Sequence, residues 1–213
     1  MIFLKKIYFL ILFLLLLSIS FASVYADSNI NINVIINGQQ VSITDSSLNF
    51  LDSNRANMDN EIINFTANQV VDMYASTESY KQGVSDIAKT YGYDVVTVNI
   101  DSDLNDGSLP LVSAVKGTSM TPTLHSGDII IINRTQEIKT GDVVVCNDTE
   151  YGLIVKRVGE VNGANVYLQS DNKSKELIND GGLFYVEEGL HKWVTLDRIY
   201  GVVKYDLTEN STS

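Results

Sequence analysis

The chain has few residues that form covalent cross-links or end helices and strands: one cysteine and two prolines among 213 residues. It also has only one tryptophan. A single cysteine excludes an internal disulfide and a site built from several thiolates. Cys146 directly follows the apolar run 143–145, so we expect it to be a small buried hydrophobic residue and not a reactive thiol. The sequence predicts no metal site and no cofactor, and a hydrophobic core must hold the fold together.

Basic residues are also scarce, because 15 lysines and arginines stand against 26 aspartates and glutamates, for a net charge of −11. Binding to nucleic acid depends on cations that neutralise phosphates, so we expect no nucleic-acid partner. There are only two histidines. His125 follows the Ser119 turn and His191 lies in a charged stretch, so we interpret both as surface or loop residues.

The longest apolar run lies at the beginning of the chain. Lys5 and Lys6 precede residues 7–22, which are almost wholly apolar, and Val24-Tyr25-Ala26 offers a possible cleavage site. The run approaches the roughly 20 residues that a membrane-spanning helix needs. Residues 1–26 are therefore either a hydrophobic helix that anchors the protein in the membrane or a cleaved signal peptide. In both interpretations the rest of the chain lies on the extracytoplasmic side of the cell membrane.

Residues 27–108 are predicted to form a small α+β region whose role the sequence leaves open. Asn37-Gly38 lies between alternating apolar runs within residues 32–44, the strongest short signal for a hairpin. The remaining elements are expected from apolar spacing and turn residues: a loop over 45–60, one or two helices over 61–90 with a break near 76–79, a strand over 93–100, and a polar linker over 101–108.

Residues 109–207 contain short β-type runs separated by turn signals, which is typical of a mainly β barrel or sandwich. We expect strands at 111–116, 128–133, 142–146, 152–159, 165–169, 183–186 and 198–205, and a polar tail at 208–213.

The residues most suggestive of chemistry lie in the segment GTSMTPTLHSGD, from Gly117 to Asp128. Ser119 is followed by Pro122, which has a fixed φ and no backbone donor. The segment leads directly into the apolar run 129–132. This arrangement predicts a stiff turn that presents the Ser119 hydroxyl in one direction, as a nucleophile needs.

A serine nucleophile needs a base to take its proton. Lys156 lies in the apolar strand sequence GLIVKRV, where burial should lower its pKa and favour the neutral amine. Side chains alternate along a strand, so only one of Lys156 and Arg157 can point inward. Ser-Lys pairs are a known variant of the serine-protease arrangement, and we assign Ser119 as nucleophile and Lys156 as general base.

The order of these motifs resembles that of type I signal peptidases. The boxes are SMTPTL at 119–124, Gly-Asp pairs at 127–128 and 141–142, VKRVGEVNG at 155–163, and SDN at 170–172. The resemblance covers roughly residues 112–205. It implies a signal-peptidase-like β fold, a lysine and not a histidine as base, membrane association, and cleavage of exported preproteins after small residues in their signal-peptide region.

The resemblance also suggests supporting residues. Asp171 in the SDN box is the first candidate to support the base, with Glu176 and Asp180 as weaker ones. The backbone N–H of Ser119 is expected to stabilise the oxyanion. Some relatives add a hydroxyl two residues before the nucleophile, where this chain has Gly117, so Thr118 is a substitute candidate. An extended substrate is expected to add as a strand beside residues 112–116, near Met120.

Two alternatives remain open at this stage. The chain could be a self-cleaving Ser-Lys peptidase similar to SOS repressors, although it has an export-type segment and no DNA-binding domain. It could also be a surface binding or accessory protein on a degenerate peptidase fold, because serine replaces the glycine of the Gly-Asp-Asn box at Ser170.

Overall fold

The computed structural model describes residues 29–45, 53–174, 176–180, 183–187 and 189–206. The predicted targeting segment 1–26 and the predicted tail 208–213 lie outside these ranges. Within them, no helix is both long enough and apolar enough to cross a membrane.

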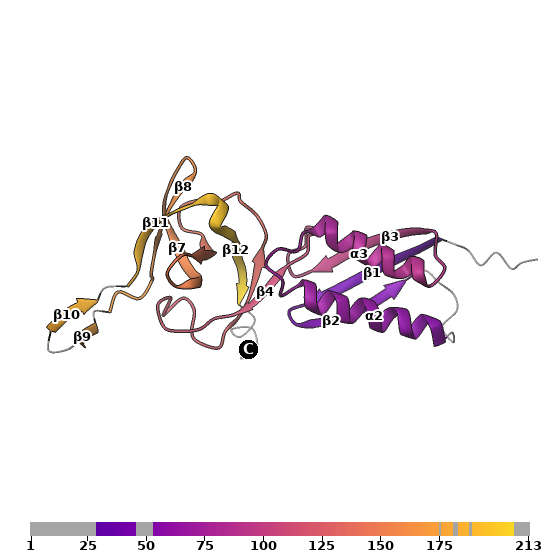
Figure 1. Cartoon of the computed structure of the whole chain (residues 1–213), viewed down its shortest axis with the longest axis horizontal. Coiled ribbons are helices and arrows are strands. Elements are labelled where there is room, and N and C mark those ends of the chain that lie inside the picture. Colours follow the sequence, from indigo (N-terminus) through magenta and orange to yellow (C-terminus); the bar gives the residue numbers. More distant parts are fainter. Residues whose placement is uncertain (1–28, 46–52, 175, 181–182, 188, 207–213) are drawn as a thin grey trace, which may run out of the picture.

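The first part of the chain is a three-stranded sheet covered on one face by two helices (Figure 1). Its elements are β1 (Asn29–Asn37), β2 (Gln40–Asp45), α2 (Ser53–Gln69), α3 (Thr77–Thr90) and β3 (Val95–Ser102). The strand order is β2-β1-β3, with β1 antiparallel to β2 and parallel to β3. A parallel pair needs a crossover connection, which α2 and α3 provide.

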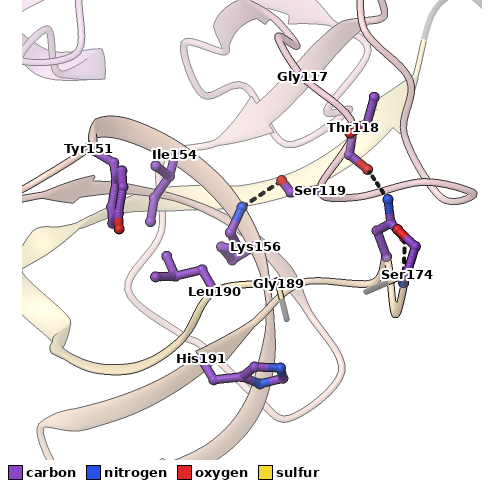
Figure 2. Close-up of a pocket in the computed structure, with 11 residues that line it drawn as sticks. Gly117, Thr118, Ser119, Tyr151, Ile154, Lys156, Ser174, Gly189, Leu190 and His191 are labelled. Carbon is purple, nitrogen blue, oxygen red and sulfur yellow. Dashed lines mark hydrogen bonds between the residues drawn. The ribbon is translucent and has the colours of Figure 1, made fainter. Parts of the chain in front are cut away.

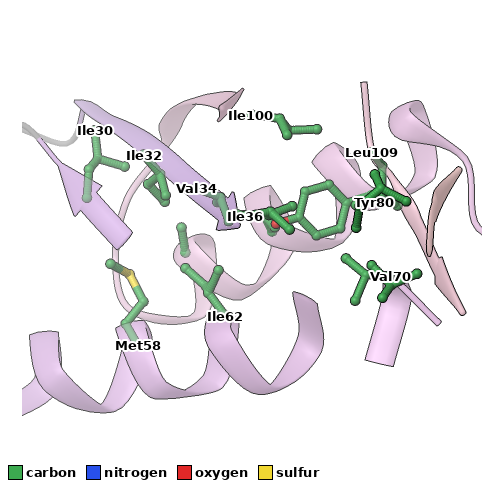
Figure 3. Close-up of a cluster of buried hydrophobic side chains, with 14 residues drawn as sticks. Ile30, Ile32, Val34, Ile36, Met58, Ile62, Val70, Tyr80, Ile100 and Leu109 are labelled. Atoms are coloured by element: carbon green, nitrogen blue, oxygen red, sulfur yellow. The ribbon is translucent and has the colours of Figure 1, made fainter. Parts of the chain in front are cut away.

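Alternation along β1 determines which face of this sheet is covered. Ile30, Ile32, Val34 and Ile36 are all buried (Figure 3), whereas Asn31 is exposed and Asn33 and Ile35 are partly exposed. The predicted hairpin is confirmed, because Asn37 pairs with Gln40 and Gly38 adopts a φ of 57°, a conformation that favours glycine.

The helices differ from the prediction at their ends. Residues 53–60, predicted as loop, are the first turns of α2. These turns are almost entirely polar and bury only Met58, so they show no helical periodicity that the sequence could reveal. The predicted break near 76–79 is actually the start of α3, where Ser76 and Ser79 form a reciprocal capping box. The loop between the helices covers residues 70–76.

The second part is mainly β, as predicted. Its strands are β4 (Leu111–Ala114), β5 (Ile129–Asn133), β6 (Val143–Asp148), β7 (Gly152–Asn162), β8 (Asn165–Gln169), β9 (Glu176–Asp180), β10 (Leu183–Glu187), β11 (His191–Thr195) and β12 (Ile199–Asp206). Seven of them form one curled antiparallel sheet in the order β11-β8-β7-β6-β12-β5-β4, and β9 and β10 form a separate hairpin (Figure 1). The sequence analysis did not identify β9 or β11.

The two parts meet through a packed junction beside β4 (Figure 1). The Val112 N–H donates to the Val70 carbonyl at 2.7 Å, and Val112 and Ile131 join the hydrophobic core of the first part. Arg134 donates to the carbonyls of Gln69 (3.0 Å) and Pro110 (3.3 Å). Burial lowers the pKa of Arg134 to about 10. The first part is therefore bonded to the strands that lead to Ser119.

Candidate active site

Ser119 lies in a loop of turns that connects β4 to β5. Two backbone hydrogen bonds close this loop, from Val115 N–H to the Asp128 carbonyl and from Gly127 N–H to the Val115 carbonyl. Met120 and Leu124 are buried in the core cluster beneath it. These contacts hold Ser119 on a fixed turn, as the sequence predicted.

The two Gly-Asp pairs build the same local structure. Gly127 and Gly141 have φ angles of 102° and 95°, which few non-glycine residues adopt. The carboxylate of Asp128 accepts from His125 N–H at 2.6 Å, and that of Asp142 accepts from Lys139 N–H at 2.9 Å. Each carboxylate therefore closes the turn that precedes its own strand, which is a structural role.

Lys156 points from β7 directly at the Ser119 hydroxyl (Figure 2). Its Nζ lies 2.7 Å from Ser119 Oγ and 3.0 Å from the Val155 carbonyl oxygen. The residue is only 5% exposed, and this burial lowers the pKa of Lys156, although the charge of Asp171 acts in the opposite direction. The structure thus brings together two side chains 37 residues apart in sequence, with an environment that favours the neutral amine.

Arg157 points to the other side of β7, as alternation requires. Its guanidinium binds the Asp171 carboxylate through two nitrogens, at 2.7 and 2.6 Å, and also donates to the Gly141 carbonyl at 2.7 Å. Thr123 donates to the same carboxylate at 2.5 Å. Asp171, the first candidate to support the base, makes its side-chain hydrogen bonds to Arg157 and Thr123, which join β7 to the Ser119 loop, and it acts on Lys156 through its charge.

Asn172, which the sequence analysis did not single out, supports the nucleophile turn. Its backbone N–H donates to the Ser119 carbonyl at 3.0 Å, and its Nδ2 donates to the Thr118 carbonyl at 3.1 Å. The Ser119 backbone N–H donates to no group in the described part of the chain. Asn172 therefore fixes the carbonyls of this turn and leaves one N–H available to a ligand.

A cavity of about 590 Å³ opens beside Ser119 and Lys156 (Figure 2). Gly117, Thr118, Ser119, Tyr151, Ile154, Lys156, Asn172, Ser174, Gly189, Leu190 and His191 line it. Gly117 and Thr118 are thus at the site, as predicted. His191 is exposed, in agreement with its interpretation as a surface residue, and it also lines this cavity. The alternation of HKWVT was the available signal for β11, but charged residues on either side of that segment obscured it.

A smaller cavity of about 170 Å³ lies on the other side of the dyad. It is bounded by residues 113–116 of the β4 edge and by residues 153–156 of β7. β4 is the last strand of the sheet, and β7 pairs with β8 only from Arg157 onward. Beside this cavity, the outer edges of β4 and β7 therefore pair with no strand in the described part of the chain. This is the region where the sequence predicted that a substrate strand would add.

Cys146 and the weaker candidates Glu176 and Asp180 lie on strands β6 and β9. Cys146 is fully buried, and burial raises the pKa of its thiol to about 11, which confirms its prediction as a core residue. Glu176 and Asp180 lie on β9, and their side chains are outside the described part. No cluster of three or more metal-binding side chains occurs among the residues whose placement is described.

Comparison with known proteins finds a similar family for the part of the chain that carries the dyad. No curated protein matches the chain. Residues 80–180, a little under half of the 213, match the model of the family described as Peptidase S24-like. This segment includes Ser119, Lys156 and the Arg157–Asp171 pair. The part of the chain that carries the dyad is therefore similar to the Ser-Lys serine peptidases of the Peptidase S24-like family.

Proposed function

We propose that the protein is a membrane-associated serine endopeptidase that cleaves the signal peptides of exported precursors after small residues, as type I signal peptidases do. The observation that carries the peptidase assignment is the 2.7 Å contact between Lys156 Nζ and Ser119 Oγ in a buried setting. The match of residues 80–180 to the Peptidase S24-like family supports the reaction class. The export and membrane part of the proposal rests on residues 1–26 and on the resemblance to signal peptidases.

The dyad performs the reaction in two halves. Neutral Lys156 takes the Ser119 hydroxyl proton while Oγ attacks the scissile carbonyl carbon, and the carbonyl oxygen becomes an oxyanion beside the Ser119 N–H. When the C–N bond breaks, Lys156 returns the proton to the leaving amine, and an acyl-enzyme remains. Lys156 then takes a proton from water as the water oxygen attacks the ester carbon. When the bond from that carbon to Ser119 Oγ breaks, Lys156 gives the proton to Oγ, which releases the acid product and restores the dyad. Because the base must be neutral, the rate rises with pH through the lowered pKa of Lys156.

The smaller cavity is where the side chain of the residue before the scissile bond would lie. Val115, Ile130 and Val145 are part of its wall, so an aliphatic side chain at that position would find apolar contacts. The free edges of β4 and β7 offer backbone hydrogen bonds to an extended substrate. Small residues just before the scissile bond are the feature that a signal-peptide cleavage site presents.

The decisive experiment is cleavage of a model preprotein in detergent, with N-terminal sequencing of the product. Wild type should cut after a small residue. Ser119→Ala and Lys156→Ala should each lose at least about 10³-fold in rate, the order seen when a member of a catalytic unit is removed. His191→Ala, which changes the same cavity without touching the dyad, is the matched control. Near-normal cleavage by Lys156→Ala would reject the dyad.

Self-cleavage is a second candidate, favoured by the family match and by the possible site at Val24-Tyr25-Ala26. Incubation of the purified full chain at several concentrations distinguishes it, because an intramolecular reaction has a half-time that does not depend on concentration. A binding protein on a degenerate fold is less well supported, because the dyad contact is intact. A serine-reactive probe that fails to label Ser119 would favour that alternative.

A further inference from the structure

The outer edge of β4 is hydrogen-bonded to another segment of the chain at Val112 and is open to a groove at Ala114. Ser113 and Leu111 lie opposite Ile130 and Ile132 of β5, while the Val112 N–H points away from β5 and donates to the Val70 carbonyl. Backbone groups alternate in direction along an antiparallel strand, so Ala114 faces the same edge as Val112. At Ala114 that edge opens into the smaller cavity. The loop between α2 and α3 therefore closes one end of the groove.

This loop is anchored by some of its side chains and exposes others. Val70 is buried in the core of the first part, and Met73 packs against the cluster that contains Met120, next to Ser119. Val71, between these anchors, is 57% exposed, and Tyr74, directly after Met73, is 80% exposed. The Tyr74 ring meets Tyr200 edge-on at 5.9 Å. The Tyr200 hydroxyl also donates to the Tyr74 hydroxyl at 3.3 Å. Val71 and the Tyr74 ring are thus largely exposed on the loop whose Val70 carbonyl closes the groove.

We propose that Val71 and Tyr74 form a subsite for apolar substrate residues several positions before the scissile bond. This inference rests on the proposed function, which puts the small residue before that bond in the cavity beside β4. The preceding residues then run along β4, away from Ser119. At about 3.3 Å per residue, three or four residues bring the substrate to Val112, where Val70 occupies the edge and the substrate must pass over the loop.

The side chains of Val71 and Tyr74 indicate which substrate residues would bind to them. Aliphatic and aromatic side chains gain free energy from apolar partners that remove them from water, and neither Val71 nor Tyr74 carries a charge. A signal peptide has an apolar stretch before its small-residue cleavage site, so the subsite would contact that stretch. The first part of the chain, which contains neither Ser119 nor Lys156, then contributes to substrate selection.

The test compares peptides that differ only upstream of the cleavage site. A short peptide begins three residues before the bond, a long one begins ten residues before it with leucines in the added part, and a third has serines in their place. Val71→Ser and Tyr74→Ser are compared with Val95→Ser, an equally exposed valine (57%) at the beginning of β3. Two readouts are used: kcat/KM, and Kd from fluorescence anisotropy on the Ser119→Ala background.

Wild type should prefer the long leucine peptide over the short one by about tenfold or more, the low end of discrimination by apolar contacts. Val71→Ser and Tyr74→Ser should each reduce that ratio severalfold, and Val95→Ser should preserve it. Equal Kd values for the three peptides, or equal effects of all three substitutions, would overturn the subsite. Absence of cleavage together with a preserved difference in Kd would refute the peptidase proposal and leave the subsite standing.

Discussion

Arg157 and Asp171 face each other in a two-pronged ion pair on the side of β7 opposite Lys156, with nitrogen–oxygen distances of 2.7 and 2.6 Å. Thr123 of the nucleophile loop donates to the same carboxylate. Two adjacent basic residues of β7 thus have different roles. Lys156 contacts Ser119, whereas Arg157 binds Asp171 and the Gly141 carbonyl.

Asp171→Asn should lower the free energy of unfolding at pH 7 by about 2 kcal/mol, because hydrogen bonds to charged groups are the stronger ones. The hydrogen bonds from the Arg157 guanidinium are the main reason that the pKa of Asp171 lies below its usual value. The stabilisation is therefore complete above the unfolded-state pKa of about 3.9 and is lost as pH falls through the folded pKa. Urea titrations at several pH values measure it.

The control for this prediction is Asp101→Asn, at an exposed aspartate on β3. It should change the unfolding free energy little at any pH. The difference in unfolding free energy between wild type and Asp171→Asn should become smaller below about pH 4. A difference that stays constant through that range would show that the ion pair contributes no stability.

Lys156→Met should leave the unfolding free energy at pH 7 unchanged or raise it, although it removes the proposed base. Burial lowers the pKa of Lys156 in the folded protein, so the unfolded chain binds the proton more tightly. Wild type therefore gains stability as pH rises from the folded pKa towards the unfolded value of about 10.4. Methionine has no such dependence. Urea titrations from pH 6 to 10 should show that the unfolding free energy of wild type rises relative to that of Lys156→Met. A difference in unfolding free energy that does not change with pH would contradict the lowered pKa of Lys156.

The dyad could be predicted from sequence because its residues lie in patterns with few interpretations. Ser119 lies in a stiff turn before a strand, and Lys156 interrupts an apolar strand. The β4 to β8 strands were found because their apolar runs are separated by glycines and aspartates. These local signals needed no knowledge of distant contacts.

The features that the sequence did not predict depend on contacts between segments far apart in the chain. Asp171 was assigned to Lys156 because both belong to the motif set, yet strand alternation puts Arg157 on the side from which Asp171 approaches. Polar turns of α2 are helical because Met58 and Ile62 are buried under β1. Only the packed fold brings His191 and Gly189 to the cavity wall.

Gly189 is close to Ser170, and this contact explains why a side chain is excluded there. A Cβ at position 189 would lie 2.6 Å from Ser170 Cβ and 2.8 Å from its Oγ. Gly189→Ala should therefore cost about 1–3 kcal/mol of unfolding free energy through overpacking. Ser170→Gly in the same molecule removes both crowded atoms and should recover much of the loss. A double-mutant cycle by urea denaturation measures the coupling, and additive costs would show that the two positions are independent.

Asn172→Ala should reduce kcat/KM for a model preprotein by about tenfold or more, because small displacements of reacting groups can cost on the order of a hundredfold. The substitution removes the Nδ2 donor to the Thr118 carbonyl and frees the turn that positions Ser119. Stability should fall by only about 1 kcal/mol, the net value of an ordinary hydrogen bond. Ser174→Ala is the matched control, since the Ser174 hydroxyl donates to Asn172 Oδ1 at 2.6 Å and lines the same cavity but makes no hydrogen bond to the turn in the described part of the chain. If both variants lose the same activity, the cavity wall and not the position of Ser119 is responsible; if neither loses activity, Asn172 does not position the nucleophile.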